Sequence, residues 1–333
     1  MARVISIDDE GGADAAIAAA IAVLEAGRPV AVPTETVYGL AADATDPAAI
    51  TSIYETKGRP RFNPLICHMS DLAMAERHAM FDPISRKLAE TFWPGPLTLV
   101  LPLSDRSNIH ALATAGLDSV GIRVPLGFPA RLIGAYGRPL AAPSANSSGL
   151  VSPTTAAHVE ADLGAKIGVI IDGGACPVGV ESTIVKVEDG RIRLLRPGGV
   201  PVEAIEDATG LSVERLKAAG TAAIEAPGML ASHYAPRAQV RLNATEVLAD
   251  EALIAFGQEP AAGAEKARVV LNLSQAGDLA EAAANLFAYL KQADATGAFG
   301  IAVMPIPEQG LGEAINDRLV RAAAPRGAEG AEA

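Results

Sequence analysis

Residues 46–69 of this chain read "DPAAITSIYETKGRPRFNPLICHM" and predict a helix, a basic turn and a strand in succession. Asp46 has the short acidic side chain that is favoured at a helix N-cap, Pro47 suits the first helical position, and Gly58 suits the helix end. The apolar run at 64–69 is short enough for a buried strand. A helix followed by a buried strand is typical of an α/β domain.

The turn between this helix and strand gathers three cations, Lys57, Arg59 and Arg61, on a segment stiffened by Pro60 and Pro64. A solvated basic turn is one explanation. The prolines favour another, because they reduce the conformational freedom that is lost when cations converge on a ligand. Arginine suits phosphate or carboxylate through paired hydrogen bonds, whereas lysine acts as a point charge. The turn is therefore a candidate anion site, in which Arg61 has no assigned role.

The remainder of the first 200 residues continues this alternation of helical and strand patterns. Apolar residues three and four apart predict helices, and short apolar runs between turn residues predict buried strands. The mixed order predicts an α/β domain with a large twisted mixed sheet and flanking helices. Helices are predicted near 11–28, 83–92 and 129–136 and after an N-cap at Ser152; strands near 29–34, 96–103, 119–126, 138–145 and 167–174; and a hairpin over 182–199 that turns at Asp189-Gly190.

The pattern changes after residue 200, where a short helical stretch gives way to an irregular segment rich in proline and glycine. Short strands near 252–257, 268–273 and 300–306 then alternate with helices near 278–295 and 310–324. This order predicts a small Rossmann-like α/β domain, although no G-x-G-x-x-G motif marks a dinucleotide site. The predicted organisation is a first domain over 1–201, a linker over 202–239, a C-terminal domain over 240–324 and a disordered tail over 325–333.

The composition restricts the kind of ligand. The chain carries 27 lysine and arginine residues against 39 aspartate and glutamate residues, which gives a formal net charge of -12. A large basic surface for nucleic acid is therefore not expected. A small anionic ligand, held by a few local cations, agrees better with this charge.

The two cysteines, Cys67 and Cys176, predict neither a disulfide framework nor a zinc site, because no C-x-x-C spacing occurs. The N-terminal residues lack the basic and then apolar pattern of a signal peptide. The apolar run at 15–24 is about half of the roughly 20 residues that a membrane span needs. We expect a cytoplasmic protein without a membrane partner.

Two further polar segments follow predicted strands, at the positions where open α/β sheets usually bind ligands. They are "PTETVYGL" at 33–40 and "APSANSSG" at 142–149. Each is also an ordinary turn sequence. In the second segment, Ser144 and Asn146 offer hydroxyl and amide donors, and loop amides can form an anion-binding concavity.

Four polar residues in or beside apolar strands need an explanation. Arg123 requires a partner, because a buried charge is costly alone, and Arg196 poses the same question less sharply. His68 is more simply explained as a hydrogen-bonded core histidine, and Ser182 as a cap at the start of a strand. The G-x-S-x-G, Walker A and H-E-x-x-H motifs are absent. Phosphoryl or nucleotidyl transfer remains open, since it works mainly by positioning and charge neutralisation.

Taken in order, these segments resemble the motifs of the YrdC-domain family in its longer, two-domain Sua-type form. The resemblance covers nearly all of residues 11–201. It also includes an H-Y-A-P signature, His233-Tyr234-Ala235-Pro236, and a small C-terminal domain. The matching segments are "PTETVYGL", the K-x-R of "KGRPRFNPL", "CH" at 67–68, "WPGPLTLVL", "VGIRVP", the S-x-N of "APSANSSG", "SPT", "VESTIV" and "LLRPG".

The resemblance implies a nucleotidyltransferase that acts as an L-threonylcarbamoyladenylate synthase. Such an enzyme joins L-threonine, bicarbonate and ATP into threonylcarbamoyl-AMP and releases pyrophosphate, with Mg²⁺ as the accompanying ion. A downstream threonylcarbamoyl-transferase complex then modifies the adenosine beside the anticodon of tRNAs that read ANN codons. The resemblance implies only indirect or weak contact between this chain and tRNA.

The resemblance also implies a catalytic domain over 1–201 and assigns its site residues. Lys57 and Arg59 are the implied catalytic residues, and no metal ligand is assigned. At Ser119 a threonine would also fit the family pattern. The implied ATP site comprises Lys57, Arg59, Asn63, Ser119, Ser144, Ser152, Arg196 and Tyr234, and the implied L-threonine site comprises Thr36, His68, Arg123, the backbone at Ala142, and Ser182.

These assignments agree with the physical chemistry of the implied reaction. Arg123 would pair with the carboxylate of threonine, which would answer why a charge lies in that strand. Lys57, Arg59 and Arg196 would offset the charge of the triphosphate. A carbamate and a mixed anhydride both need shelter from water, so Tyr234 on the linker suits a lid over the nucleotide.

Two other functions agree with parts of this pattern. A YrdC-like carbamoyl transfer to another acceptor, as in hydrogenase maturation, comes with further domains and zinc-type cysteine pairs that this sequence lacks. An RNA-binding YrdC-like module would use a basic concavity. The net charge of -12 argues against tight, sequence-independent RNA binding.

Overall fold

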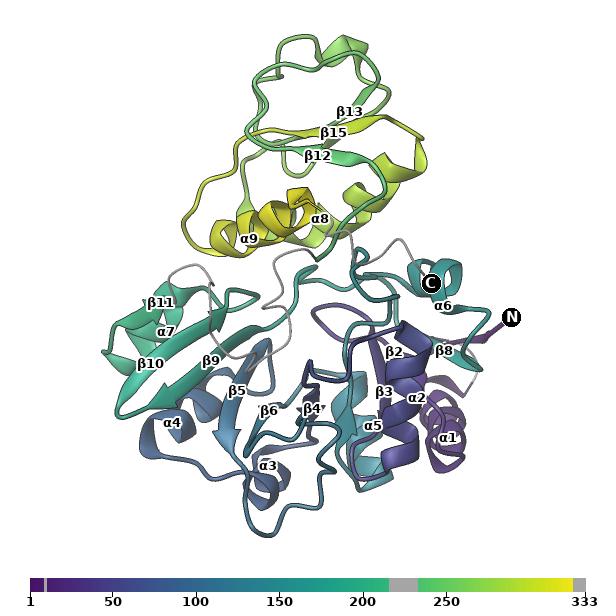
Figure 1. Ribbon diagram of the computed structural model, residues 1–333, viewed down its shortest axis with the longest axis vertical. Helices are drawn as coiled ribbons and strands as arrows, with labels where there is room; N and C mark the ends of the chain where they lie inside the picture. Colours follow the sequence, from purple (N-terminus) through teal and green to yellow (C-terminus); the bar gives the residue numbers. More distant parts are fainter. Residues whose placement is uncertain (9–10, 216–232, 326–333) are drawn as a thin grey trace.

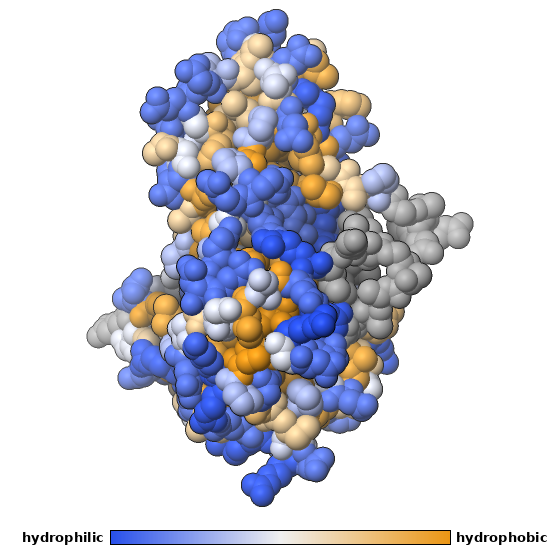
Figure 2. All heavy atoms as spheres, turned by 90° about the vertical axis from the view of Figure 1, so that its left-hand side faces the viewer, coloured by the Kyte–Doolittle hydropathy of each residue, from blue (hydrophilic) through white to orange (hydrophobic). Residues whose placement is uncertain are grey.

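The computed structural model describes residues 1–8, 11–215 and 233–325, which form a large first domain and a smaller C-terminal domain seated on it (Figure 1). Figure 2 shows the same two parts from the side, with hydrophilic residues over much of the face in view. No helix in the described ranges is long and apolar enough to cross a membrane. The expectations for residues 216–232 and for the tail after 325 lie outside the described residues.

The first domain is built on an 11-stranded sheet, so the predicted large mixed sheet is confirmed. Both parallel and antiparallel pairs occur within it. In spatial order the strands are β1 (Arg3–Ser6), β8 (Val169–Asp172), β2 (Val30–Val32), β3 (Gly39–Asp43), β7 (Leu140–Ala141), β4 (Ile66–His68), β6 (Ser119–Arg123), β5 (Leu97–Pro102), β9 (Thr183–Glu188), β10 (Arg191–Arg196) and β11 (Val213–Arg215). Strand β4 pairs with β6 in parallel and with β7 antiparallel, which places segments far apart in the chain side by side.

The helices of the first domain pack against this sheet and against one another. They are α1 (Gly12–Glu25), α2 (Pro47–Lys57), α3 (Leu72–His78), α4 (Pro83–Phe92), α5 (Phe128–Tyr136), α6 (Ala156–Leu163) and α7 (Val202–Thr209). Helix α1 contacts β8 and α5, α2 contacts β3, and α4 contacts β5 and α7. This packing buries the apolar side of each helix, which stabilises the α/β layers.

Helix α2 begins and ends as its sequence predicts. The carboxylate of Asp46 accepts a hydrogen bond from the amide of Ala48 at 2.8 Å, and Pro47 is the first helical residue. Gly58 adopts a left-handed conformation with φ of 60°, which glycine reaches at little cost. These two ends fix Lys57 at the last position of the helix, directly before the basic turn.

The predicted N-cap at Ser152 is wrong. Helix α6 begins at Ala156, and its N-cap is Thr155, whose hydroxyl accepts a hydrogen bond from the amide of His158 at 3.2 Å. Ser152 is buried instead, and its hydroxyl donates to the carboxylate of Glu181 at 2.5 Å. Ser152 therefore bonds to Glu181, a distant residue, and does not cap the helix as its neighbours in the sequence indicate.

Four elements of the first domain differ from the sequence prediction. Strand β3 pairs antiparallel with β2, although residues 33–40 read as a turn, and α3 has no clear periodic pattern. Residues 202–215 read as part of the linker, but α7 packs on α4 and β11 extends the sheet in parallel with β10. The first domain thus extends beyond residue 201.

The C-terminal domain has a parallel four-stranded sheet, and the strands and helices predicted for it are present. The predicted pattern omits β12, which is short and partly exposed. In spatial order the strands are β12 (Gln239–Arg241), β15 (Gly300–Val303), β13 (Glu251–Ala255) and β14 (Val270–Asn272); a 3-10 turn spans Ala264–Lys266, and the helices are α8 (Leu279–Ala295) and α9 (Leu311–Ala323). Figure 1 shows α8 and α9 between this sheet and the first domain.

Candidate active site

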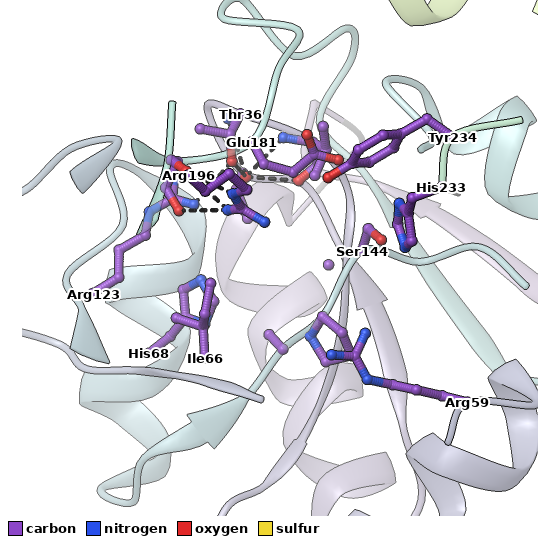
Figure 3. A pocket seen from close by; sticks show the side chains of 16 residues that line it. Thr36, Arg59, Ile66, His68, Arg123, Ser144, Glu181, Arg196, His233 and Tyr234 are labelled. Carbon is purple, nitrogen blue, oxygen red and sulfur yellow. Dashed lines mark hydrogen bonds between the residues drawn. The ribbon is translucent and has the colours of Figure 1, made fainter. Parts of the chain in front are cut away.

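A polar cavity of about 50 Å³ lies between the middle of the large sheet and the segment that carries His233 and Tyr234 (Figure 3). Its walls come from strand ends and loops that are far apart in the sequence. The lining residues are Thr34, Thr36, Val37, Gly39, Arg59, Ile66, His68, Arg123, Ala142, Pro143, Ser144, Glu181, Ser182, Arg196, His233 and Tyr234. Ligands of open α/β sheets usually bind at such strand ends.

The floor of the cavity carries a buried ion pair. Arg123, at the end of β6, lies 2.7 Å from a carboxylate oxygen of Glu35, and both side chains are buried. The guanidinium also donates to the hydroxyl of Thr36 at 2.9 Å and to the carbonyl of Gly95 at 3.1 Å. The sequence prompts a search for a partner of Arg123, and this partner is Glu35 of the same protein. The charge in the strand therefore does not by itself require a ligand.

His68 lies beside this ion pair, at the position of β4 that pairs with Arg123. Burial, and then the nearby Arg123, lower the pKa of His68 to about 3, so the imidazole is neutral at physiological pH. Its Nδ1 atom has no hydrogen-bond partner among the described residues. His68 is buried and hydrogen-bonds to the backbone of Ile66, as a core histidine would, but it also lines the cavity and leaves Nδ1 available to a ligand.

Lys57 and Arg59, the cations at the start of the basic turn, have different places around the cavity. The ammonium of Lys57 donates to the carbonyls of Ser144 and Asn146, so it supports the loop after β7 and does not itself line the cavity. Arg59 lines the cavity and donates to the carbonyl of Pro64 at 2.9 Å.

Burial shifts the pKa of both cations. Burial, and then Arg59, lower the pKa of Lys57 well below its ordinary value, and burial lowers the pKa of Arg59 to about 10. Neither cation forms an ion pair with a carboxylate in the described part of the chain. An anionic ligand would supply the missing counter-charge.

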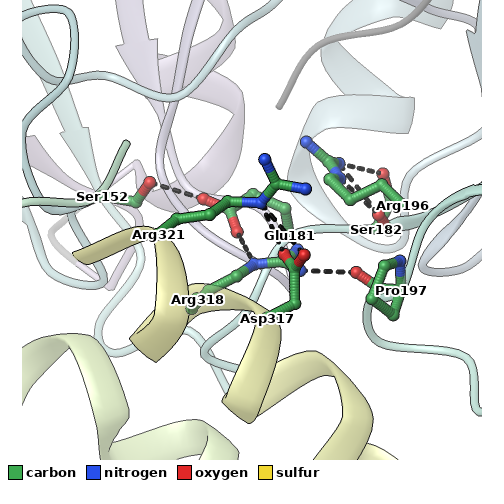
Figure 4. Close-up of polar contacts among 8 residues, drawn as sticks. All are labelled: Ser152, Glu181, Ser182, Arg196, Pro197, Asp317, Arg318 and Arg321. Carbon is green, nitrogen blue, oxygen red and sulfur yellow. Dashed lines mark hydrogen bonds and ion pairs between the residues drawn. The ribbon is translucent and has the colours of Figure 1, made fainter. Parts of the chain in front are cut away.

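Glu181 connects the two domains at the roof of the cavity (Figure 4). Its carboxylate accepts from Ser152 and forms an ion pair of 3.0 Å with Arg318 of α9, a side chain with no exposed surface. Arg318 also donates to the carbonyl of Pro197 at 2.6 Å. Burial alone would raise the pKa of Glu181, but Arg318 and Arg196 hold it below its ordinary value. The C-terminal domain thus places a charged residue directly behind the cavity wall.

The C-terminal domain also holds Tyr234 over the cavity. Its ring stacks on Phe287 of α8 with ring centres 5.5 Å apart, and the guanidinium of Arg318 lies 5.4 Å from the ring centre. Tyr234 has a positive φ of 62°, which is unusual for a residue with a side chain. Next to it, burial lowers the pKa of His233 to about 3. Tertiary packing, and not local preference, sets the course of the chain here.

The structure brings most of the candidate residues from the sequence into one cavity. Ser119 lies at the opposite end of β6 from Arg123, and Asn63 is buried with its side-chain oxygen unpartnered among the described residues. Arg196 donates to the carbonyl of Ser182 at 2.8 Å. Thr36, Arg59, His68, Arg123, Ala142, Ser144, Ser182, Arg196 and Tyr234 line the cavity, whereas Lys57, Asn63, Ser119 and Ser152 do not.

Sequence reasoning missed Glu35, Glu181, His233 and Arg318. The first three lie inside segments that already stand out, "PTETVYGL", "VESTIV" and the H-Y-A-P signature, so a search for counter-charges near Arg123 and Arg196 would have found two of them. Arg318 has no such signal, because its neighbours read as an ordinary amphipathic helix.

The described residues contain no cluster of three or more His, Cys, Asp or Glu side chains arranged to hold a metal ion. Glu181 is the carboxylate that lines the cavity, and Ser152 and Arg318 already occupy its oxygens. Since Mg²⁺ prefers carboxylate and phosphate oxygens, these residues do not fit a resident Mg²⁺.

A mixed α/β sheet with cations and hydroxyl groups around a cavity at its strand ends is the arrangement of YrdC-like nucleotide-using enzymes. A family model described as "Telomere recombination", for Sua5, YciO and YrdC proteins, matches residues 22–198. A second, described as "Threonylcarbamoyl-AMP synthase, C-terminal domain", matches residues 200–324. The chain therefore belongs to the two-domain Sua5 family of threonylcarbamoyl-AMP synthases.

Similar proteins of known name agree with this membership. The threonylcarbamoyl-AMP synthase of Pyrococcus abyssi is 42% identical over 89% of this chain and 90% of its own length. The Bacillus subtilis protein of the same name is 39% identical over 94% of both chains. A crystal structure of P. abyssi Sua5 complexed with L-threonine superposes with a TM-score of 0.86 at 38% identity, and covers 96% of this chain and 97% of that one.

Proposed function

We propose that this chain synthesises L-threonylcarbamoyl-AMP from L-threonine, bicarbonate and ATP, with release of pyrophosphate. The observation that carries the proposal is the cavity itself, which is lined by a buried Arg123, a half-buried Arg59, a neutral histidine and several hydroxyl groups. Two anions have to be held together for this reaction, and two separate cationic groups allow it.

The threonine site would lie on the floor of the cavity. Arg123 has N–H groups beyond those bonded to Glu35 and Thr36, and these would donate hydrogen bonds to the substrate carboxylate. His68, neutral and with Nδ1 unpartnered, would hydrogen-bond to the substrate without adding charge. The backbone at Ala142 and the hydroxyl of Ser182 would complete the site.

The ATP site would lie on the opposite wall. Arg59 and Arg196 would contact the phosphates, Ser144 would donate to them, and Tyr234 would cover them. Lys57 and Asn63, which lie behind this wall, would shape the turn and stabilise charge from a second layer. Ser152 and Ser119 have weaker support, because one is bonded to Glu181 and the other lies at the far end of β6.

The chemistry would proceed by two bond formations. The amine of threonine adds to the carbon of carbon dioxide, which forms from bicarbonate by loss of hydroxide, and a proton leaves the nitrogen. A carbamate oxygen then attacks the α-phosphorus, the bond from that phosphorus to the β-phosphate oxygen breaks, and pyrophosphate leaves. The protein acts mainly by positioning and charge stabilisation. Mg²⁺ would enter with the triphosphate as part of the substrate, since the cavity offers no free carboxylate.

Substrate entry would require the cavity to open. Its volume of about 50 Å³ is far below the roughly 300–1,000 Å³ of small-molecule sites. His233 and Tyr234 form one side of it, so their displacement would admit ATP and their return would exclude water. Limited proteolysis after Tyr234 should slow when ATP and threonine are both present.

The product would pass to a threonylcarbamoyl-transferase complex that modifies the adenosine beside the anticodon in tRNAs reading ANN codons. The functional test is pyrophosphate release from ATP, measured with and without threonine and bicarbonate. We expect release to depend on both. Release that is unchanged when threonine is omitted would refute the synthase assignment, and a salt-dependent gel shift with tRNA would instead favour an RNA-binding module.

A further inference from the structure

A second cleft, of about 630 Å³, lies between α6 of the first domain and α8 of the C-terminal domain. Residues 235–237, which directly follow Tyr234, form one of its walls. Small-molecule sites typically measure roughly 300–1,000 Å³ and occur preferentially between domains. The cleft therefore has the size and the place of a ligand site, separate from the catalytic cavity.

Two cations line this cleft without carboxylate partners. Lys291 of α8 is half-buried, and burial lowers its pKa below the ordinary value. Arg237 also lines the cleft and is exposed. In the described part of the chain neither side chain forms an ion pair or a hydrogen bond. A half-buried ammonium group without a partner favours the arrival of an anion.

A histidine adds a third hydrogen-bond donor. Nδ1 of His158 accepts from the amide of Thr154 at 3.3 Å, so the proton of the neutral ring resides on Nε2. Burial, and then the nearby Lys291, lower the pKa of His158 to about 4, and the ring stays neutral at physiological pH. The Nε2 group is then a donor for a ligand at any pH above that range.

Two carboxylates also line the cleft, and both act on Lys291 by raising its pKa, although neither forms an ion pair with it. Asp162 accepts from the amide of Ser147 at 2.8 Å and from its hydroxyl at 2.6 Å. Asp294 accepts from the amide of Ala238 at 2.8 Å. The cleft thus offers more free donors than free acceptors. Apolar surface from Leu150, Val151 and Tyr289 lies beside these donors.

We propose that this cleft binds a small organic anion, in which one phosphate or carboxylate group sits on an apolar or aromatic body. Lys291, Arg237 and His158 bind the anionic group, and Tyr289 packs against the body. Ala235 and Pro236 line this cleft, and the adjacent Tyr234 lines the catalytic cavity. Occupancy therefore restrains the segment that covers the catalytic site, which makes the cleft a regulatory site.

AMP is a suitable probe, because it joins one phosphate to an aromatic body. Equilibrium binding to the full chain should show two AMP sites per chain, one in each cavity. The double variant Lys291→Gln/Arg237→Gln should lose one of them, with at least about tenfold weaker binding for each lost charge-assisted contact. Adenosine, the same body without phosphate, should bind the cleft at least about tenfold more weakly than AMP.

A control variant removes the same charge elsewhere. Lys266→Gln/Arg106→Gln changes two exposed cations outside the cleft and should keep both sites. Ala288→Trp fills the cleft without altering charge and should abolish the second site, which tests the proposal if the first variant folds poorly. Equal AMP binding by the unmodified chain and by both cleft variants overturns the proposal.

Discussion

Two groups of cations lie at and around the candidate active site and differ in what they contact. On the basic turn, Lys57 and Arg59 donate to main-chain carbonyls and have no carboxylate partner among the described residues. At the domain interface, Arg318 forms an ion pair with Glu181. Under the proposed function the first group is available to a ligand, whereas the second already forms an ion pair that joins the domains. Loss of function and loss of stability should therefore separate between them.

The largest expected effect falls on the interface. Arg318→Ala leaves Glu181 buried without its partner and should lower the free energy of unfolding by about 3–5 kcal/mol. Urea unfolding followed by circular dichroism measures this. The matched control is Arg215→Ala, because Arg215 also pairs across the domains, with Glu313 at 2.7 Å, but is 51% exposed. Its loss should cost less than about 1 kcal/mol. Equal losses of unfolding free energy in both variants would mean that the buried ion pair stabilises the protein no more than the exposed one.

The next effect falls on the basic turn. Arg59→Ala should lower kcat/KM for adenylate synthesis about 100-fold, because a preorganised charge near the phosphates is lost. Its melting temperature should change little. Arg61→Ala is the control, since Arg61 is exposed on the same turn, and its rate should stay within about twofold. A normal rate for Arg59→Ala would mean that its missing counter-charge is not a substrate.

Lys57→Ala sharpens the comparison, because Lys57 belongs to the turn but supports a neighbouring loop. Its loss leaves the carbonyls of Ser144 and Asn146 without this donor. We expect a rate loss similar to that of Arg59→Ala together with a lower melting temperature. A rate loss without any change in melting temperature would mean that Lys57 acts on the ligand, as proposed for Arg59, and does not support the loop.

Glu35→Gln tests a pair that shares features of both groups, since Arg123 has a carboxylate partner and also lines the cavity. We expect KM for threonine to rise about tenfold, while kcat changes less, because the guanidinium loses its orientation. Steady-state kinetics at varied threonine measure the two constants. A kcat loss with unchanged KM would indicate that Glu35 acts on the chemical step instead.

The last effect is absent at neutral pH and develops only in acid. The folded-state pKa of His68 is about 3, below its ordinary value, so between about pH 6.5 and 3 the unfolded chain binds a proton that the folded chain does not. Stability is therefore lost as pH falls through this window, by up to about 1.4 kcal/mol per pH unit. In urea unfolding at several pH values, the free energy of unfolding of His68→Gln should fall less steeply below pH 6.5 than that of the unmodified chain. The same pH dependence of the free energy of unfolding in both proteins would mean that His68 is not buried as described.

Much of the fold follows from local patterns. The caps of α2, the helices α4, α8 and α9, and the strands β5 and β13 form where apolar spacing and turn residues predict them. Strand β3 and the correct start of α6 could not be predicted in this way. Strand β3 forms by antiparallel pairing with β2, and α6 starts after a local cap at Thr155, which the sequence pattern at Ser152 and Pro153 obscures; the bond between Ser152 and Glu181 then removes Ser152 from any capping role.

The sequence by itself determined the α/β class, the two-domain order and the segments from which the cavity is built, because helical and strand periodicity and turn chemistry are local properties. Only the tertiary structure decided which charges are already neutralised. Glu35 and Arg123 are 88 residues apart, and Glu181 and Arg318 are 137 apart, so the counter-ion of each arginine is a matter of chain topology. Whether a cation has a carboxylate partner, as Arg318 does, or lacks one, as Arg59 does, is therefore decided only when the chain folds.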